Sequence, residues 1–219
     1  MNLLISDYDG TLYIDNEKQL RKNIEAIKEF RKNGNIFVIS TARGYNSIKE
    51  EINKYQIPYD YLTCVNGSII FDKDNNIIYK NTLSVDDLFK IKNILESNIH
   101  FIDIYDNTNN SISSNILYVS SKEFWKYKLI KEQLIDYDVI MRNYNLFIKK
   151  HSSKLDGANF LKDYLKIEDI YAVGDSEDEL ELLRTYNGYK MILSSPCLYN
   201  KNIKTTTSVH KVIKKIKKI

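Results

Sequence analysis

The chain has 219 residues, which is enough for one large domain or two small ones. Hydrophobic residues make up 43% and charged residues 28% of the chain, so intrinsic disorder is excluded. Lys and Arg number 32 against 29 Asp and Glu, and the net charge of +3 lacks the basic excess that is typical of nucleic-acid-binding proteins.

Cysteine content and hydropathy further limit the class of protein and the compartment that can be expected. Cys64 and Cys197 are too few for a disulfide framework or a thiolate metal site. The first residues, MNLLISDYDG, lack the basic region and apolar run of a signal peptide. No stretch of about 18 apolar residues occurs, so no transmembrane helix is expected. We therefore expect a cytoplasmic protein that binds neither nucleic acid nor a membrane.

The first 65 residues alternate short apolar runs with helical patterns. Apolar runs at 3–6, 36–39 and 61–65 predict buried strands. Apolar residues that recur every three or four positions predict helices over 17–33 and 45–54. A strand–helix–strand–helix–strand series predicts a parallel sheet with right-handed crossovers.

The pattern changes near residue 78, where an insertion begins. Helical spacing followed by two strand-like segments occurs twice, with helices at 84–97 and 123–136 and strands at 100–105, 115–120, 138–142 and 146–149. This repeated order predicts a small sheet with two helices on one face. A polar loop at 107–115 joins the first two strands and is a candidate for substrate contact.

The strand and helix alternation returns after residue 151. The segments are a helix over 155–165, a strand at 170–173, a helix over 177–186 and a strand at 191–193. The tail at 209–219 has apolar residues on one face and lysines on the other. This tail is interpreted as a last helix packed on the sheet, with binding to anionic lipid as the alternative.

The layout predicts an α/β protein in two parts. Residues 1–78 and 151–219 form a parallel-sheet core domain, and residues 79–150 form an inserted α+β cap domain, with the order αββ-αββ.

Acidic residues follow two of the predicted core strands. Asp7 and Asp9 come after the first strand, and Asp175 and Asp178 come after the strand at 170–173. In open parallel sheets, ligands bind at the carboxyl ends of the strands. Several carboxylates in one crevice repel each other unless a cation neutralises them, and oxygen ligands favour Mg²⁺.

Two further residues complete a site for phosphate chemistry. Thr41 follows the second strand and offers a hydroxyl and backbone N–H groups to phosphate oxygens. Lys154 precedes a predicted helix and adds a positive charge. One carboxylate of the acidic set can attack phosphorus while another carries protons. The set predicts phosphoryl transfer through a covalent aspartyl intermediate.

These segments resemble the four motifs of the haloacid dehalogenase-like phosphatases. The matching segments, in the family's order and spacing, are DYDGT at 7–11, Thr41 in ISTARG, Lys154 in SSK and GDSED at 174–178. The insert between the second and third motifs resembles the compact type-2B cap of the Cof-type branch. The resemblance implies a Rossmann-like core and Mg²⁺-dependent hydrolysis of a small phosphomonoester such as a sugar phosphate.

The resemblance also implies a role for each acidic residue. Asp7 is the nucleophile and a metal ligand, and Asp9 is the general acid and base, with its backbone carbonyl on the metal. Asp175 is the third protein ligand. Asp178 binds the metal directly or through water, or orients Lys154. The branch usually has Asn-Asp where this chain has Asp178-Glu179, which adds a negative charge.

The remaining residues concern the substrate. Thr41 and Lys154 hold the phosphoryl group in the family. Arg43 stands in Thr-Ala-Arg, where the branch usually has Thr-Gly-Arg, and it is either a substrate contact or a surface residue at a helix start. Asn66, which precedes Gly67, resembles the branch's Asn-Gly after the third strand. It is either a substrate-pocket residue or part of a tight turn.

Three functions fit these motifs. The first is a phosphatase. The second is a phosphomutase, which forms the same aspartyl phosphate but returns the phosphoryl group to a sugar. The third is a non-catalytic ligand-binding protein that keeps the fold, and the intact set of Asp7, Asp9, Thr41, Lys154 and Asp175 argues against it.

Overall fold

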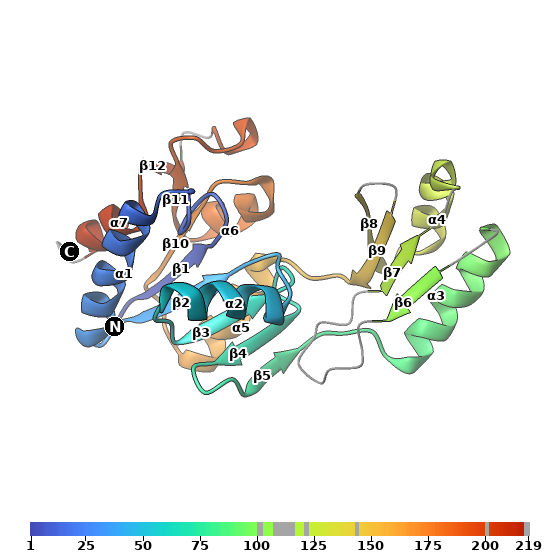
Figure 1. The fold of residues 1–219 in the computed structure, drawn as a ribbon, viewed down its shortest axis with the longest axis horizontal. Coiled ribbons are helices and arrows are strands. Elements are labelled where there is room, and N and C mark those ends of the chain that lie inside the picture. Colours follow the sequence, from blue (N-terminus) through green and yellow to red (C-terminus); the bar gives the residue numbers. More distant parts are fainter. Residues whose placement is uncertain (100–102, 107–116, 121–122, 143–144, 200–201, 217–219) are drawn as a thin grey trace. The chain divides into compact units, whose positions relative to one another are not determined.

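The chain folds into two compact units in the computed structural model (Figure 1), which describes residues 1–99, 103–106, 117–120, 123–142, 145–199 and 202–216. The first unit comprises Met1–Tyr79 and Ser153–Ile219, and the second comprises Lys80–Ser152. Among the described residues, no helix has the length and apolar character needed to cross a membrane.

An eight-stranded sheet forms the centre of the first unit. Its strands are β1 (Leu3–Asp7), β2 (Ile36–Ser40), β3 (Tyr61–Cys64), β4 (Ile69–Asp72), β5 (Ile77–Lys80), β10 (Ile170–Gly174), β11 (Asn187–Met191) and β12 (Lys204–Thr206). Their order is β12-β11-β10-β1-β2-β3-β4-β5. The strands from β12 to β3 pair in parallel, whereas β4 runs antiparallel to β3. The predicted parallel α/β core is therefore confirmed.

Helices cover the sheet because its central strands are apolar on both faces. The helices of this unit are α1 (Glu17–Lys32), α2 (Tyr45–Tyr55), α5 (Lys154–Leu165), α6 (Leu180–Thr185) and α7 (Val209–Ile216). All five residues of β1 are buried. Leu3 and Ile5 pack in one core cluster with Leu161 of α5 and Leu182 of α6. Successive side chains of a strand alternate between faces, so Leu4 is buried on the other face.

The tail helix packs into the core. Val209, Val212, Ile213 and Ile216 of α7 are all buried, and α7 lies against α1 (Figure 1). Its apolar face is therefore occupied within the fold, as the first interpretation of the tail expected, and is not available to insert into lipid. The last residues, 217–219, lie outside the described part.

The second unit has the order helix, two strands, helix, two strands. Its elements are α3 (Val85–Asn98), β6 (Asp103–Asp106), β7 (Leu117–Ser120), α4 (Tyr127–Gln133), β8 (Tyr137–Arg142) and β9 (Asn145–Lys150). The strands form an antiparallel sheet in the order β6-β7-β9-β8. Ile91 and Leu95 of α3 share a core with Ile130 of α4 and Ile148 of β9. The polar loop at 107–115 lies outside the described residues.

Several elements differ from the sequence-based predictions. The strands β4, β5 and β12 were not predicted, and the helix predicted over 177–186 begins as the 3₁₀ turn Glu177–Glu179 before α6.

Two further differences concern β11 and α4. The strand predicted at 191–193 is wrong, because β11 ends at Met191 and Leu193 is 91% exposed. The actual strand looks polar in sequence, yet Tyr189 and Lys190 are buried. The Lys190 Nζ lies 3.5 Å from the centre of the Tyr199 ring, so a cation–π contact covers it. The helix predicted over 123–136 is also shorter, since Phe124–Lys126 is a 3₁₀ turn and α4 ends at Gln133.

The second unit offers a test of stability at Asp87, the third residue of α3. Its carboxylate accepts hydrogen bonds from the backbone N–H and hydroxyl of Ser84, from the Tyr137 hydroxyl and from the Lys150 Nζ, at 2.7–2.9 Å. Burial alone would raise the pKa of Asp87, but the hydrogen bonds from Lys150, Ser84 and Tyr137 outweigh it and hold the pKa well below its usual range.

Asp87→Asn is therefore expected to lower the free energy of unfolding by about 1–2 kcal/mol at pH 7, since it weakens the helix cap and the ion pair. Because the folded state lowers the pKa, this contribution is present above the unfolded value near 4 and is lost as the pH falls below it. Urea unfolding at pH 7 and pH 3 checks this, because the difference in unfolding free energy between the wild-type chain and Asp87→Asn should be smaller at pH 3. The exposed neighbour Asp86 supplies the control, and equal midpoints for Asp86→Asn and Asp87→Asn at pH 7 would contradict the account.

Candidate functional site

Asp7 and Asp175 lie at the carboxyl ends of two paired strands. Asp7 is the last residue of β1 and is 6% exposed, and Asp175 follows the neighbouring strand β10. The Thr11 hydroxyl donates a hydrogen bond of 2.7 Å to Asp175 Oδ1. Gly10 has a φ of +75°, and a Cβ on it would lie 2.4 Å from an Asp175 carboxylate oxygen. The glycine of DYDGT therefore makes room for Asp175 beside the first motif.

Lys154 joins Asp7 to a second acid. It is the first residue of α5, whose N-cap is Ser153, and its side chain is 3% exposed. Its Nζ lies 2.5 Å from Asp7 Oδ1 and also pairs with Glu179 Oε1. Burial alone would lower the pKa of Lys154, but the Asp7 and Glu179 carboxylates outweigh it and raise the pKa to about 12. The lysine therefore stays charged at neutral pH.

Glu179 is the residue that sequence reasoning missed. It is fully buried, and its Oε2 accepts hydrogen bonds from the backbone N–H of Ser176 at 2.7 Å and from the Ser176 hydroxyl at 2.8 Å. Gly174 leaves room for it, because a Cβ there would lie 2.5 Å from Glu179 Cγ. The spacing Ser-x-x-Glu, a capping box at the start of a helical turn, was the available signal.

The Asp178 side chain contacts Asn66 rather than Lys154. Its Oδ2 accepts a hydrogen bond of 3.2 Å from Asn66 Nδ2, whereas the adjacent Glu179 occupies the place beside the lysine. The 3₁₀ turn Glu177–Glu179 directs these neighbouring side chains to different partners. One role considered for Asp178 was to orient Lys154. In the structure it is Glu179, not Asp178, that contacts Lys154.

Asn66 stands in a strained turn that packs on the start of α5. Val65, Asn66 and Gly67 have φ angles of +52°, +50° and +93°. A Cβ at Gly67 would lie 2.1 Å from the Ser153 carbonyl oxygen, so only glycine fits there. The β-branched Val65 rarely adopts this conformation. Asn66 thus belongs to a tight turn, as one of its two interpretations expected, and this turn contacts the helix that carries Lys154.

Thr41 and Arg43 follow β2. Thr41 is buried, its N–H donates to the Thr63 carbonyl at 2.9 Å, and its hydroxyl oxygen accepts from the Arg43 N–H at 3.1 Å. The Arg43 guanidinium binds the Asp9 carboxylate, with Nε 2.8 Å from Oδ2 and Nη2 2.6 Å from Oδ1. In this structure Arg43 therefore contacts an acid of the first motif.

The side chains of the four acids predicted as metal ligands do not all lie together. Within the described ranges, no group of three or more His, Cys, Asp or Glu residues is arranged to hold a metal ion. Asp7 and Asp175 are neighbours that influence each other's pKa, while the carboxylates of Asp9 and Asp178 bind Arg43 and Asn66.

The charge balance nevertheless favours a cation. Burial raises the pKa of Asp7, and the Lys154 ammonium offsets only part of this effect. Burial also raises the pKa of Asp175, although the hydrogen bond from Thr11 acts in the other direction. The Lys154 ammonium pairs with two carboxylates, those of Asp7 and Glu179, and the Asp175 carboxylate lies close enough to Asp7 to influence its pKa. The carboxylate oxygens of Asp7 and Asp175 are the kind of ligand that a hard divalent cation such as Mg²⁺ prefers.

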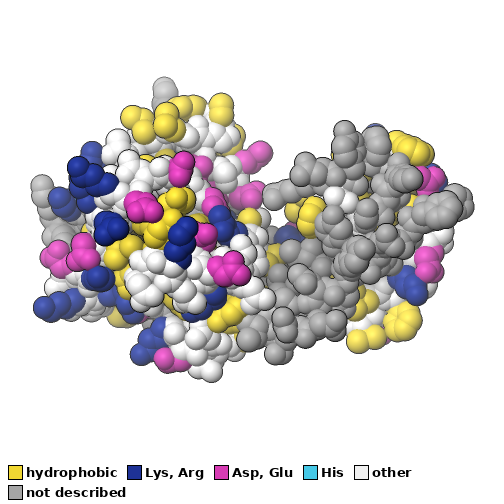
Figure 2. All heavy atoms as spheres, viewed as in Figure 1, with side chains coloured by type: hydrophobic (Ala, Val, Ile, Leu, Met, Phe, Trp, Pro, Cys, Tyr) yellow, Lys and Arg dark blue, Asp and Glu magenta, His cyan; other side chains and the backbone are white. Residues whose placement is uncertain are grey.

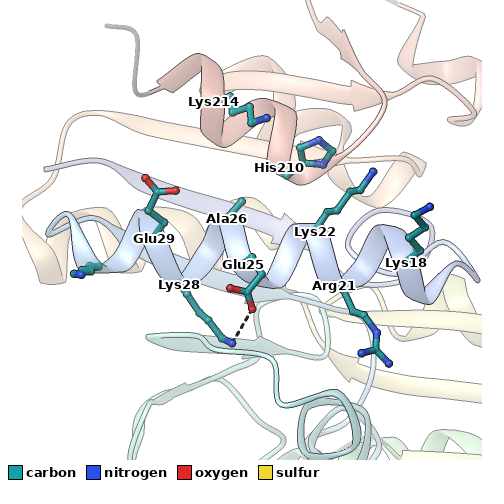
Figure 3. A pocket seen from close by; sticks show the side chains of 10 residues that line it. Lys18, Arg21, Lys22, Glu25, Ala26, Lys28, Glu29, His210 and Lys214 are labelled. Carbon is teal, nitrogen blue, oxygen red and sulfur yellow. Dashed lines mark hydrogen bonds and ion pairs between the residues drawn. The ribbon is translucent and has the colours of Figure 1, made fainter.

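The surface of the first unit carries charges of both signs. Figure 2 shows basic and acidic side chains interspersed on the visible face. A hollow of about 950 Å³ lies along α1 and α7 (Figure 3), with Lys22 on one helix and His210 and Lys214 on the other. Its lining includes none of the predicted site residues, so it is separate from the acidic cluster.

Comparison with known proteins identifies the family. A model of the haloacid dehalogenase-like hydrolases matches residues 4–143. The chain therefore belongs to this family, and the predicted family is confirmed. An "Uncharacterized protein" of Mycoplasma capricolum is 34% identical over 106 residues, which cover 46% of this chain and 40% of that protein. A "Putative phosphatase" of Buchnera aphidicola is 31% identical over 144 residues, which cover 60% of this chain and 53% of the relative. The chain thus spans about half the length of these relatives or less.

Solved structures share the fold over nearly the whole chain. A haloacid dehalogenase-like hydrolase from Bacteroides thetaiotaomicron has a TM-score of 0.77 at 16% identity, with 98% of this chain and 99% of that chain covered. The sucrose-phosphatase from Synechocystis, solved with sucrose and phosphate, has a TM-score of 0.68 at 16% identity, with 99% and 97% covered. The similarity to both structures confirms the predicted fold class.

Proposed function

We propose that the protein is a Mg²⁺-dependent phosphatase that hydrolyses a small phosphomonoester, such as a sugar phosphate, through an aspartyl phosphate on Asp7. The observation that carries the proposal is the buried Asp7 carboxylate, held through Oδ1 by the charged Lys154 at the end of β1. Membership of the hydrolase family supports it, as does the similarity to a relative named as a phosphatase.

The first half of the reaction forms the covalent intermediate. Lys154 engages Asp7 Oδ1, so Oδ2 is the oxygen that attacks phosphorus. A bond forms between Oδ2 and phosphorus, the bond from phosphorus to the leaving oxygen breaks, and that oxygen takes a proton from Asp9. Lys154 and Thr41 hold the phosphoryl oxygens during the transfer.

The second half releases phosphate. A water molecule gives its proton to Asp9 and attacks phosphorus, and the bond between phosphorus and Asp7 breaks. This returns both aspartates to their starting states. The acceptor of the phosphoryl group is therefore water in a phosphatase and a sugar hydroxyl in a phosphomutase, so release of inorganic phosphate distinguishes the two.

Mg²⁺ fits beside the acidic cluster. The carboxylates of Asp7 and Asp175 and the backbone carbonyl of Asp9 are the groups that would hold it, and Asp178 would join them only after leaving Asn66. When bound, the ion neutralises charge on the phosphoryl group. Asp9 needs no side-chain contact with the ion, which agrees with the binding of its carboxylate to Arg43.

The cellular setting is part of the same proposal. Cys64 and Cys197 are both free thiols, which supports a reducing, cytoplasmic compartment.

Chelation tests the metal assignment. With p-nitrophenyl phosphate as substrate, excess EDTA is expected to abolish phosphate release, and added Mg²⁺ to restore it. Binding of Mg²⁺ to the folded state should also raise the melting temperature of the wild-type chain. The increase should disappear in Asp175→Asn, which removes one carboxylate from the cluster, and persist in the Asp86→Asn control. Full activity in excess EDTA would refute the metal assignment.

A further inference from the structure

Arg43 fixes both the position and the plane of the Asp9 carboxylate. Its Nε lies 2.8 Å from Oδ2 and its Nη2 lies 2.6 Å from Oδ1, which is the parallel two-bond geometry of a guanidinium and a carboxylate. In the proposed function, Asp9 is the residue that exchanges protons with the leaving group and water. The orientation of the proton-transfer group therefore depends on Arg43.

Arg43 is itself held from several sides. Its guanidinium carbon lies 5.2 Å from the centre of the Tyr8 ring, which is fully buried. The Tyr8 hydroxyl donates a hydrogen bond of 3.0 Å to Glu51 of α2. The Arg43 backbone donates to the Thr41 hydroxyl and accepts from the Val65 N–H, at 3.1 Å in each case. The arginine is thus a pre-organised clamp rather than a mobile surface side chain.

Stability alone gives little reason for this ion pair. The Arg43 and Asp9 side chains are 32% and 52% exposed, and ion pairs at such exposure typically contribute about 0–1 kcal/mol. The two hydrogen bonds occupy two of about four lone-pair positions on the carboxylate. Each oxygen of Asp9 therefore keeps one position at which it can bind or release a proton.

We propose that Arg43 is a positioning residue, which holds the Asp9 carboxylate in the orientation needed for proton transfer. The inference rests on the proposed phosphatase function. It differs from a substrate-binding role for Arg43, because it predicts an effect that passes entirely through Asp9.

The chain offers a matched control in a second two-bond arginine–aspartate pair. Arg31 binds Asp60 with Nε 2.9 Å from Oδ2 and Nη2 2.8 Å from Oδ1, and neither residue belongs to the site. Lysine keeps the charge of arginine but cannot form both parallel bonds. Arg43→Lys and Arg31→Lys are therefore the same chemical change at two places in one unit.

Arg43→Lys is expected to lower kcat for an alkyl phosphate by about 10–100-fold, because small misplacements of a catalytic group have effects of this size. KM should stay within about threefold, and the loss should be smaller for p-nitrophenyl phosphate, whose leaving group needs no proton. Arg31→Lys should keep kcat for both substrates within about twofold of the wild-type value, since Arg31 is remote from the site. A raised KM with unchanged kcat would overturn the inference in favour of substrate binding.

A double-mutant cycle gives the sharper decision. If Arg43 acts only through Asp9, the double variant Asp9→Asn, Arg43→Lys should match Asp9→Asn alone within about twofold. If the kcat losses of the two single variants multiply in the double variant, the inference is overturned while the phosphatase proposal stays intact. A wild-type chain that releases phosphate from no phosphomonoester would instead refute the proposed function. A crystal structure of Arg43→Lys tests the positioning role whether or not the wild-type chain is a phosphatase. A shifted Asp9 carboxylate supports that role, and an Asp9 carboxylate in its wild-type position contradicts it.

Discussion

Asp7→Asn is expected to abolish turnover, with a fall in kcat of more than about 10⁴-fold, because an amide cannot replace the attacking carboxylate. Lys154 keeps its pairing with Glu179 in this variant, so the protein should still fold. Steady-state phosphate release and circular dichroism check the two statements together. Rapid turnover by folded Asp7→Asn would overturn the assignment of the nucleophile.

Asp9→Asn should fail in a different way. General acid–base help is worth about 10²–10⁴-fold, or about 3–5 kcal/mol in the barrier. The loss should be near the upper end for alkyl phosphates and smaller for aryl phosphates, whose leaving groups need less protonation. Equal losses for both substrate classes would contradict a proton-transfer role for Asp9.

Glu179→Ala is expected to destabilise the first unit by about 3–5 kcal/mol, since it removes a fully buried partner of the charged Lys154. It also leaves the Ser176 N–H without the acceptor that it has in the wild-type chain. Glu179→Gln keeps much of the shape and should cost about 1–3 kcal/mol. Urea unfolding of the whole chain measures these differences.

The neighbouring acid is the control for Glu179. Asp178→Ala removes one hydrogen bond with Asn66 and should cost less than about 1 kcal/mol. Glu179→Gln should also lower kcat at least about tenfold, because Lys154 then binds Asp7 without a competing charge. A larger loss of stability from Asp178→Ala than from Glu179→Ala would reverse the assignment of the lysine's partner.

Strand ends made the central part of the site predictable. Asp7, Thr41 and Asp175 directly follow short apolar runs, and the parallel order of those strands gathers their ends at one edge of the sheet. Local hydrophobic pattern is sufficient for this prediction, because the central strands are buried on both faces.

The side-chain pairings were less accessible from sequence. Asp178 and Glu179 are adjacent acids, and only the geometry of a 3₁₀ turn decides that Glu179 faces Lys154. The pairing of Arg43 with Asp9 joins segments 34 residues apart in the chain. Local patterns carry no information on such contacts, which depend on how the loops after β1 and β2 approach each other.

The missed strands have a similar explanation. β11 contains a glycine, an asparagine and a lysine, so it lacks an apolar run, and its Lys190 is covered by a residue outside the strand, Tyr199. β12 has only three residues, Lys204–Thr206, of which two are exposed. Tertiary context, rather than local preference, places β12 at the edge of the sheet and β11 beside it.

Trapping of the covalent intermediate tests the central claim most directly. Asp9→Asn, mixed with p-nitrophenyl phosphate and quenched in acid, should accumulate phosphorylated protein, because loss of the base slows attack by water more than the first transfer. Peptide mass spectrometry is expected to place the phosphoryl group on Asp7 and to find none in the Asp7→Asn, Asp9→Asn double variant. Phosphate on any other residue, or turnover of the wild-type enzyme without a phosphorylated intermediate, would contradict the account.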